Sequence, residues 1–120
     1  MDFDGAIQAH TNWKLRLFSY TRGQVAERID VPTLRKDNVC ALGRWLYGEG
    51  PKHAADPKFK QLQEVHSAFH QSAASLGAMV DRGDSSAAAA QLSSPGSEFN
   101  RLSIRVVGLL MNLRDRGLDG

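Results

Sequence analysis

The side chains of this sequence that could bind a transition metal are histidines and the single cysteine. His66 and His70 are four residues apart in a segment with strong helical periodicity, so both imidazoles face the same side and can reach one ion. His10 and Cys40 come from two other segments. Taken singly, the histidine pair is more often solvated or packed, His10 is more often a hydrogen-bonded core residue, and Cys40 is more often a small buried apolar residue. Together the four residues supply a complete tetrahedral ligand set.

The donor types in this set favour zinc. A soft thiolate and imidazoles select Zn²⁺ over Mg²⁺ or Ca²⁺, and no cluster of carboxylates points to a harder ion. Four protein ligands leave no open position for water or substrate, which predicts a structural or regulatory site without catalysis. We expect Cys40 in the first turn of a helix, where the helix N-terminus lowers the pKa of a thiol. His53 lies in a Gly-Pro loop outside the pattern, and we expect it to be exposed to solvent.

Four helices must position these residues. Their limits follow from apolar residues at spacings of three and four and from capping residues at their ends. Val31-Pro32-Thr33 interrupts the pattern after the first helix, although Gln24 to Ile29 could extend that helix by two turns. The expected helices are 4–20, capped by Asp2 or Asp4; 39–47, capped by Asn38; 57–80, capped by Asp56 and closed by Arg82-Gly83; and 84–113, which Ser93-Ser94-Pro95-Gly96 kinks or divides. Gly117 to Gly120 reads as a frayed end.

These elements predict an all-α protein, an antiparallel four-helix bundle with a short second helix and a long loop before it. The apolar stripe of the third helix contains Phe59, Leu62 and Phe69, and it borders both His66 and His70. The imidazoles therefore face the core or its edge. Buried polar groups without partners cost about 1–3 kcal/mol each, and a metal ion would satisfy both rings at once.

Length and composition argue against several other classes of protein. A chain of 120 residues has room for one domain, residues 1–120, and 42% hydrophobic residues exclude disorder. The net charge of +2 is scattered, so we expect no nucleic-acid partner. No apolar stretch is long enough to span a membrane, and the acidic start is unlike a secretion signal. One cysteine forms no internal disulfide, which fits a cytoplasmic protein.

The three ligand-bearing segments together resemble the chemoreceptor zinc-binding (CZB) domain of bacteria. Its pattern is a histidine followed three residues later by an aromatic residue, then Cys-x-apolar-Gly-x-aromatic, then His-x-x-x-His. The matching segments are His10-Thr11-Asn12-Trp13, Cys40-Ala41-Leu42-Gly43-Arg44-Trp45 and His66-Ser67-Ala68-Phe69-His70. The resemblance implies a four-helix bundle, often a homodimer, that binds Zn²⁺ through His10, Cys40, His66 and His70. Trp13, Leu42, Gly43 and Trp45 would support the site, with Gly43 permitting close helix approach and the tryptophans excluding water.

The resemblance also implies a regulatory role. Domains of this family accompany chemoreceptor signalling modules or diguanylate cyclase domains. They respond there to zinc, and in some members to hypochlorous acid through the zinc-bound cysteine, here Cys40. This chain has no room for such an output module, so we expect one in cis or in trans.

Other functions stay open on the sequence alone. The residues could form a metal-free or structural-zinc interaction module without a sensory role. A hemerythrin-like di-iron carrier needs more histidines and bridging carboxylates than this chain offers. An enzyme would need one of the four ligands to be off the metal.

Overall fold

The computed structural model describes residues 1–24 and 28–118, and the regular elements in these ranges are all helices. They are α1 (Phe3–Thr21), α2 (Val31–Arg35), α3 (Ala41–Tyr47), the 3-10 helix η1 (Gly50–His53), α4 (Pro57–Asp81), α5 (Ser85–Ser93) and α6 (Glu98–Asp115). The prediction of an all-α protein is confirmed. No helix in these ranges is both long enough and apolar enough to cross a bilayer.

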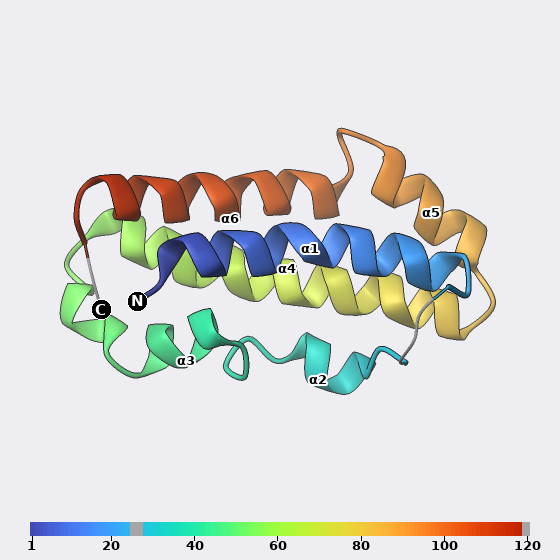
Figure 1. Ribbon diagram of the computed structural model, residues 1–120, viewed down its shortest axis with the longest axis horizontal. Helices are drawn as coiled ribbons and strands as arrows, with labels where there is room; N and C mark the ends of the chain where they lie inside the picture. The colour runs from blue at the N-terminus through green and yellow to red at the C-terminus, as the bar shows by residue number, and fades with distance from the viewer. Residues whose placement is uncertain (25–27, 119–120) are drawn as a thin grey trace.

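The long helices α1, α4 and α6 lie side by side along the long axis of the molecule (Figure 1). The chain runs along α1, returns through α2 and α3, runs forward again in α4 and returns in α6 (Figure 1). α2 packs against α4, and α5 packs against both α1 and α4. The four-helix bundle stays a prediction, since two short helices occupy the place expected for its second member.

Capping residues begin the long helices as the sequence indicates. The Asp2 carboxylate accepts the Gly5 amide hydrogen at 2.9 Å, and the Asp56 carboxylate accepts that of Lys58 at 2.9 Å. α1 ends at Thr21 and is followed by Gly23 at a φ of +66°. The helix therefore does not continue directly into the proposed extension, of which residues 25–27 lie outside the described range.

The loop expected before the short helix contains α2, which the sequence reading missed. The sequence pattern predicts a break at Pro32, yet a proline in the first helical turn loses no hydrogen bond, because amide hydrogens there have no partner within the helix. The Thr33 hydroxyl donates to the Asp30 carboxylate at 2.8 Å. Leu34 is buried, and α2 packs on α4, so tertiary contacts hold this five-residue helix in place.

The Ser-Pro-Gly segment after residue 93 divides the last predicted helix into α5 and α6. Ser97 caps α6 by accepting the Asn100 amide hydrogen at 3.2 Å. The end of α6 is more ordered than the expected frayed tail: Gly117 has a φ of +74° and the Leu118 amide donates to the Leu113 carbonyl at 3.0 Å, which closes the helix. Residues 119–120 lie outside the described range.

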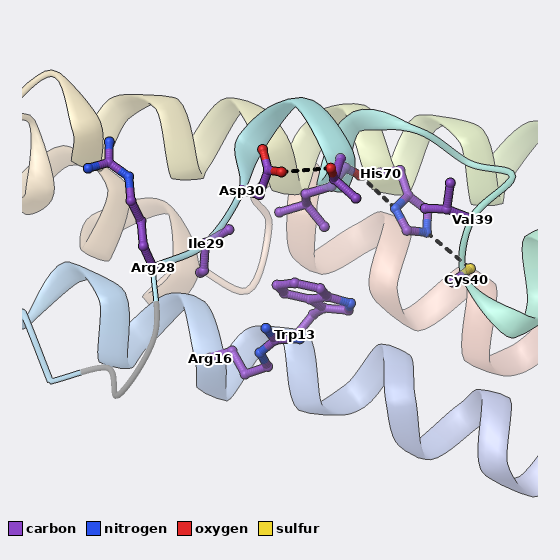
Figure 2. A pocket seen from close by; sticks show the side chains of 10 residues that line it. Trp13, Arg16, Arg28, Ile29, Asp30, Val39, Cys40 and His70 are labelled. Carbon is purple, nitrogen blue, oxygen red and sulfur yellow. Dashed lines mark hydrogen bonds between the residues drawn. The ribbon is translucent and has the colours of Figure 1, made fainter.

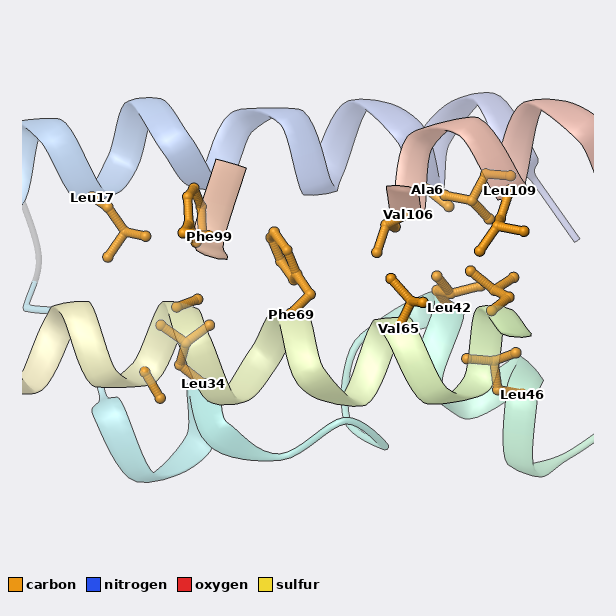
Figure 3. Close-up of a cluster of buried hydrophobic side chains, with 14 of the residues drawn as sticks. Ala6, Leu17, Leu34, Leu42, Leu46, Val65, Phe69, Phe99, Val106 and Leu109 are labelled. Carbon is orange, nitrogen blue, oxygen red and sulfur yellow. The ribbon is translucent and has the colours of Figure 1, made fainter. Parts of the chain in front are cut away.

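The core fills the space between the inward faces of the long helices (Figure 3). Phe69 and Phe99 lie at its middle with ring centroids 5.3 Å apart. His10, His66 and His70 are embedded in the same core, each at most 2% exposed. Three imidazoles inside an apolar core require partners, and this requirement defines the functional site.

Candidate metal centre

Four donor atoms from three parts of the fold converge inside the molecule. His10 comes from α1, Cys40 from the residue that precedes α3, and His66 and His70 from the middle of α4. One ligand atom from each residue lies within 4.8 Å of all the others. The structure therefore brings together all four residues that the sequence predicts as ligands.

The individual separations suit a tetrahedral ion. Cys40 Sγ lies 3.4 Å from Nε2 of His66 and 3.7 Å from Nε2 of His70. The two Nε2 atoms are 3.0 Å apart. Bond lengths typical of zinc would place two nitrogens about 3.3 Å apart, and sulfur and nitrogen about 3.6 Å apart, around one tetrahedral centre. The separations among these three donors are thus close to those around zinc, and the full set of four lies within 4.8 Å.

Backbone carbonyls orient two of the imidazoles. His10 Nδ1 lies 2.7 Å from the carbonyl oxygen of Ala6, and His70 Nδ1 lies 2.8 Å from that of Leu34. A carbonyl only accepts, so both Nδ1 atoms carry the hydrogen and both Nε2 atoms present a lone pair to the centre. Partners of this kind fix the ring and tautomer that a metal needs.

Two buried imidazole nitrogens have no hydrogen-bond partner among the described residues. These atoms are His10 Nε2, at the centre, and His66 Nδ1. His66 can donate one hydrogen from Nε2 to Sγ or to His70, but that donation leaves the lone pair of His10 unsatisfied. A cation among the four donors would bind this lone pair together with the others, so the residues present fit a metal ion.

Burial keeps the imidazoles neutral, which is the form that binds metals. Desolvation lowers the pKa of His10, His66 and His70, and the pKa of His66 falls to about 2. The positive charges that His70 and His10 would carry add to the lowering at His66.

Cys40 is the N-cap of α3 rather than a residue of its first turn. It takes the place expected for Asn38, and its Sγ accepts the Gly43 amide hydrogen at 3.3 Å. In the metal-free protein burial raises the pKa of the thiol, because desolvation outweighs the stabilisation by amide hydrogens such as that of Gly43. The expected lowering by the helix N-terminus is therefore wrong for the free thiol, whereas a coordinated thiol is deprotonated by the ion itself.

A glycine is needed at position 43 because the backbone that precedes Cys40 folds closely over Gly43. A Cβ atom at this position would lie 2.0 Å from the carbonyl oxygen of Asp37. The close approach predicted for Gly43 is thus made by its own preceding turn and not by another helix. The turn aims the Cys40 side chain at the histidines.

The remaining motif residues lie around the site in different ways. Leu42 is buried in the core, and Trp45 is buried with its ring edge-on to Phe3 and Phe59 at 5.6 Å. Trp13 is only partly buried and lines a cavity next to Cys40 (Figure 2). Their supporting role stays a prediction.

The prediction of an exposed His53 is wrong. This residue ends η1 and is half-buried, with ring centroids 6.0 Å from Trp45 and 6.4 Å from Phe59. Packing of η1 against these aromatic rings explains its burial, and it takes no part in the four-residue group.

The sequence model of the chemoreceptor zinc-binding domain matches residues 10–76, more than half of the chain. The chain belongs to the chemoreceptor zinc-binding (CZB) domain family. The matched range contains all four grouped residues, whereas α5 and α6 lie beyond it. CZB domains are regulatory zinc-binding domains rather than catalytic ones. Comparison with curated proteins and with solved structures gave no match.

The CZB site uses groups that sequence reasoning missed. The carbonyls of Ala6 and Leu34 hold the imidazoles, and the carbonyl of Asp37 closes over Gly43. Every residue has a carbonyl, so no residue type marks these positions. The spacing of Ala6 four residues before His10 was the one available signal, because residues i and i+4 are neighbours on a helix.

Proposed function

We propose that this CZB domain holds one Zn²⁺ through Nε2 of His10, His66 and His70 and Sγ of Cys40, and that it acts as a regulatory sensor. The observation that carries the proposal is the convergence of these four donor atoms within 4.8 Å in a buried site. Thiolate and imidazole donors together favour zinc among the common divalent ions. Bound zinc would link the three helical segments and keep the Cys40 sulfur as a thiolate.

Metal occupancy is the first proposed input. The donors belong to α1, to the cap of α3 and to α4, so the positions of these elements depend on whether the donors are held together. Without an ion, the lone pair of His10 Nε2 is buried without a partner. The metal-free domain is therefore expected to loosen around α1 and α3, which would change the surface that an output module contacts.

Oxidation of Cys40 is the second proposed input. The thiolate attacks the chlorine of hypochlorous acid, the Cl–O bond breaks, and the S–Cl intermediate reacts with water. The net change is RS⁻ + HOCl → RSOH + Cl⁻, in which sulfur loses two electrons and chlorine gains them. The sulfenic acid is a weaker donor than the thiolate, so Cys40 would leave the histidines and release the cap of α3.

Membership of the CZB family supports a proposal for the output and the partners. We propose a cytoplasmic signalling role, with a chemoreceptor or diguanylate cyclase module in cis or in trans controlling chemotaxis or cyclic-di-GMP synthesis.

We also propose that the domain forms a homodimer. Ile104 and Met111 project from one face of α6 and are 70% and 42% exposed, and Leu15 of α1 is 65% exposed. An Ile104→Glu variant should shift the mass measured by light scattering from dimer to monomer, whereas an unchanged dimer would place the interface elsewhere.

Elemental analysis tests the metal proposal. The purified protein should contain close to one zinc per chain, and Cys40→Ala and His66→Ala should each lower that content. His53→Ala is the matched control, because it removes a histidine outside the donor group. Protein that holds no metal when fresh and takes up no added zinc would leave the alternative, a helical interaction module without a metal.

The oxidant proposal needs a separate test. One equivalent of hypochlorous acid should release zinc to an indicator dye and add one oxygen to Cys40 by mass spectrometry. Methionine is also oxidised by this reagent, so the control is the Met79→Leu/Met111→Leu variant, which should release zinc to the same extent. A Cys40→Ala protein that still changes shape with oxidant would refute the proposal that oxidation acts through Cys40.

A further inference from the structure

The segment 36–40 joins α2 to α3 and ends in Cys40. It is not helical, and it is mostly exposed to solvent. Upstream of it, the Arg35 guanidinium donates to the side-chain oxygen of Gln71 on α4 at 3.2 Å. At its downstream end, Cys40 Sγ accepts the Gly43 amide hydrogen at 3.3 Å. The position of the thiol relative to the histidines therefore depends on what holds the residues between these two ends.

Asp37 holds the middle of this segment to α3 at two places. Its carbonyl oxygen is so close to Gly43 that a Cβ atom there would lie 2.0 Å away from it. Its carboxylate accepts the hydroxyl hydrogen of Tyr47, the last residue of α3, at 2.7 Å. Gly43 and Tyr47 are four residues apart, so they lie on the same face of the helix, about one turn from each other. Asp37 therefore spans that face, with its backbone over Gly43 and its side chain on Tyr47.

One hydrogen bond connects the middle of the segment to the helix. Within the described part of the chain, the bond from Tyr47 is the only hydrogen bond that residues 37–39 make with other residues. The carbonyl of Asp37 adds a packing contact at Gly43, whose amide hydrogen goes to the Cys40 sulfur instead. Tyr47 is 61% exposed, so its ring adds little to the core. Its hydroxyl can therefore be removed without opening a cavity in the core.

We infer that the hydrogen bond between Tyr47 and Asp37 is a clasp that keeps the Cys40 thiol at the histidines, and that Tyr47 is a positioning residue for this thiol. When the clasp opens, the segment lifts from α3 and the sulfur leaves the Gly43 amide and the imidazoles. The inference deepens the proposed function, and its part on zinc rests on that function. The frequency with which the clasp opens sets how readily a bound ion loses its one sulfur ligand.

Hydrogen exchange of the Gly43 amide, followed by NMR, reports the clasp and needs no metal. This amide is bonded to the Cys40 sulfur, so it exchanges when the segment lifts. In chelator-treated protein, Tyr47→Phe should raise the exchange rate at Gly43 about 2- to 10-fold, the range expected for the loss of one hydrogen bond. The Phe69 amide, in the middle of α4, is the reference for opening of the whole core. An unchanged rate at Gly43, or an equal rise at both amides, would overturn the inference.

The second tyrosine of the chain provides the matched control. The Tyr20 hydroxyl also donates to a carboxylate, that of Asp81 at 2.5 Å, but this bond joins the last turns of α1 and α4. Tyr20→Phe should therefore leave the exchange rate at Gly43 unchanged relative to that at Phe69. A relative rise as large as that of Tyr47→Phe would mean that the effect is not specific to the cysteine segment, and it would overturn the clasp.

Two substitutions of Asp37 separate its hydrogen bond from its charge, which also acts on His70. Asparagine keeps an acceptor oxygen without the charge, so Asp37→Asn should leave the exchange rate at Gly43 close to that of the wild type. Asp37→Ala should raise the rate as Tyr47→Phe does, and combining the two should add nothing, because both remove the same bond. Equal rates in Asp37→Asn and Asp37→Ala would assign the effect to the charge and overturn the clasp.

Zinc transfer to a chelating dye keeps this test apart from the test of the proposed function. In zinc-loaded protein of equal metal content, Tyr47→Phe should speed the transfer by a factor similar to that of the exchange rate. A chain that binds no zinc but shows faster exchange at Gly43 in Tyr47→Phe would support the clasp and refute the zinc site. A full zinc content with wild-type exchange at Gly43 in Tyr47→Phe would do the reverse.

Discussion

Gly43 occupies a position where one methyl group decides how Cys40 faces the histidines. Its missing Cβ leaves room for the Asp37 carbonyl oxygen, which would otherwise lie 2.0 Å away. We expect Gly43→Ala to displace the turn, weaken zinc binding and destabilise the protein by about 1–3 kcal/mol. Isothermal titration with zinc and urea unfolding measure the two effects.

Gly108→Ala is the matched control for this substitution. Gly108 is exposed inside α6, and apart from the adjoining backbone of the helix itself no described atom lies within 4 Å of the added methyl group. Alanine should therefore stabilise the helix by about 0.5–1 kcal/mol and leave zinc binding unchanged. Equal losses of zinc affinity in both variants would contradict the role assigned to Gly43.

The buried imidazoles make the metal-free protein sensitive to acid. The pKa of His66 is about 2 when folded and about 6.5 when unfolded, and burial also lowers the pKa values of His10 and His70. Below pH 6.5 the unfolded chain binds more protons, so the free energy of unfolding falls as the pH falls. Each neutral histidine contributes a slope of up to about 1.4 kcal/mol per pH unit.

Urea unfolding between pH 7.5 and 5 in the presence of a chelator measures this slope. His66→Leu replaces the imidazole with an apolar side chain of similar size. It should reduce the slope of the unfolding free energy against pH, because one fewer imidazole is protonated on unfolding. A slope that is the same in both proteins would mean that the His66 ring is not held neutral in the folded chain.

Sequence reasoning found the four grouped side chains because their residue types and spacing are informative. The predicted lowering of the Cys40 thiol pKa is wrong, because this pKa depends on burial, which raises it, as well as on nearby amide hydrogens, which lower it. It also mistook His53 for a surface residue. Nothing in the Gly-Pro segment indicates that η1 packs its last residue against Trp45 and Phe59.

At the scale of elements, Asn100 joins the end of α5 to the start of α6. Its buried side-chain amide donates to the carbonyls of Leu92 at 2.9 Å and Ser94 at 2.8 Å. Asn100→Leu would remove both hydrogen bonds, and although the Ser94 carbonyl would still accept the Ser97 amide hydrogen, the Leu92 carbonyl would lose this donor, so we expect a loss of about 1–3 kcal/mol in stability. Zinc content should not change, because the donors come from other elements.

Asn112→Leu provides the comparison for this loss. Asn112 lies on the same helix, and within the described part of the chain its side chain makes one hydrogen bond, accepted from Arg116 at the surface. We expect a change within about 0.5 kcal/mol, measured by the same urea unfolding. A loss as large as that of Asn100→Leu would show that asparagine in α6 stabilises the protein in some other way.

The long helices could be predicted from sequence and α2 could not, for one physical reason. α4 carries a stripe of apolar residues over many turns and an Asp-Pro start, so local patterns specify it. α2 has a single buried residue, Leu34, and is held by packing on α4. Because the Leu34 carbonyl also orients His70, the missed helix is part of the candidate metal centre.

At the scale of the whole molecule, metal removal should lower the melting temperature. Ligands that bind only the folded chain stabilise it in proportion to the logarithm of their free concentration, by about 2.7 kcal/mol at 100 times Kd. We expect the melting temperature to rise steadily with buffered free zinc and to be independent of it in His10→Ala. A rise in His10→Ala as steep as in the wild type would mean that zinc binds without α1.

The order of the donors along the chain determines when the site can be completed during synthesis. Cys40 and His66 are separated by 26 residues, and His66 and His70 both lie in the later part of the chain. At ribosomal rates of 5–20 residues per second, His66 follows the cysteine by roughly 1–5 s. For that interval the nascent chain has a thiol and a single partner imidazole, His10. A newly made chain would therefore pass through a period in which Cys40 can react before the proposed four-donor site can hold an ion that protects it.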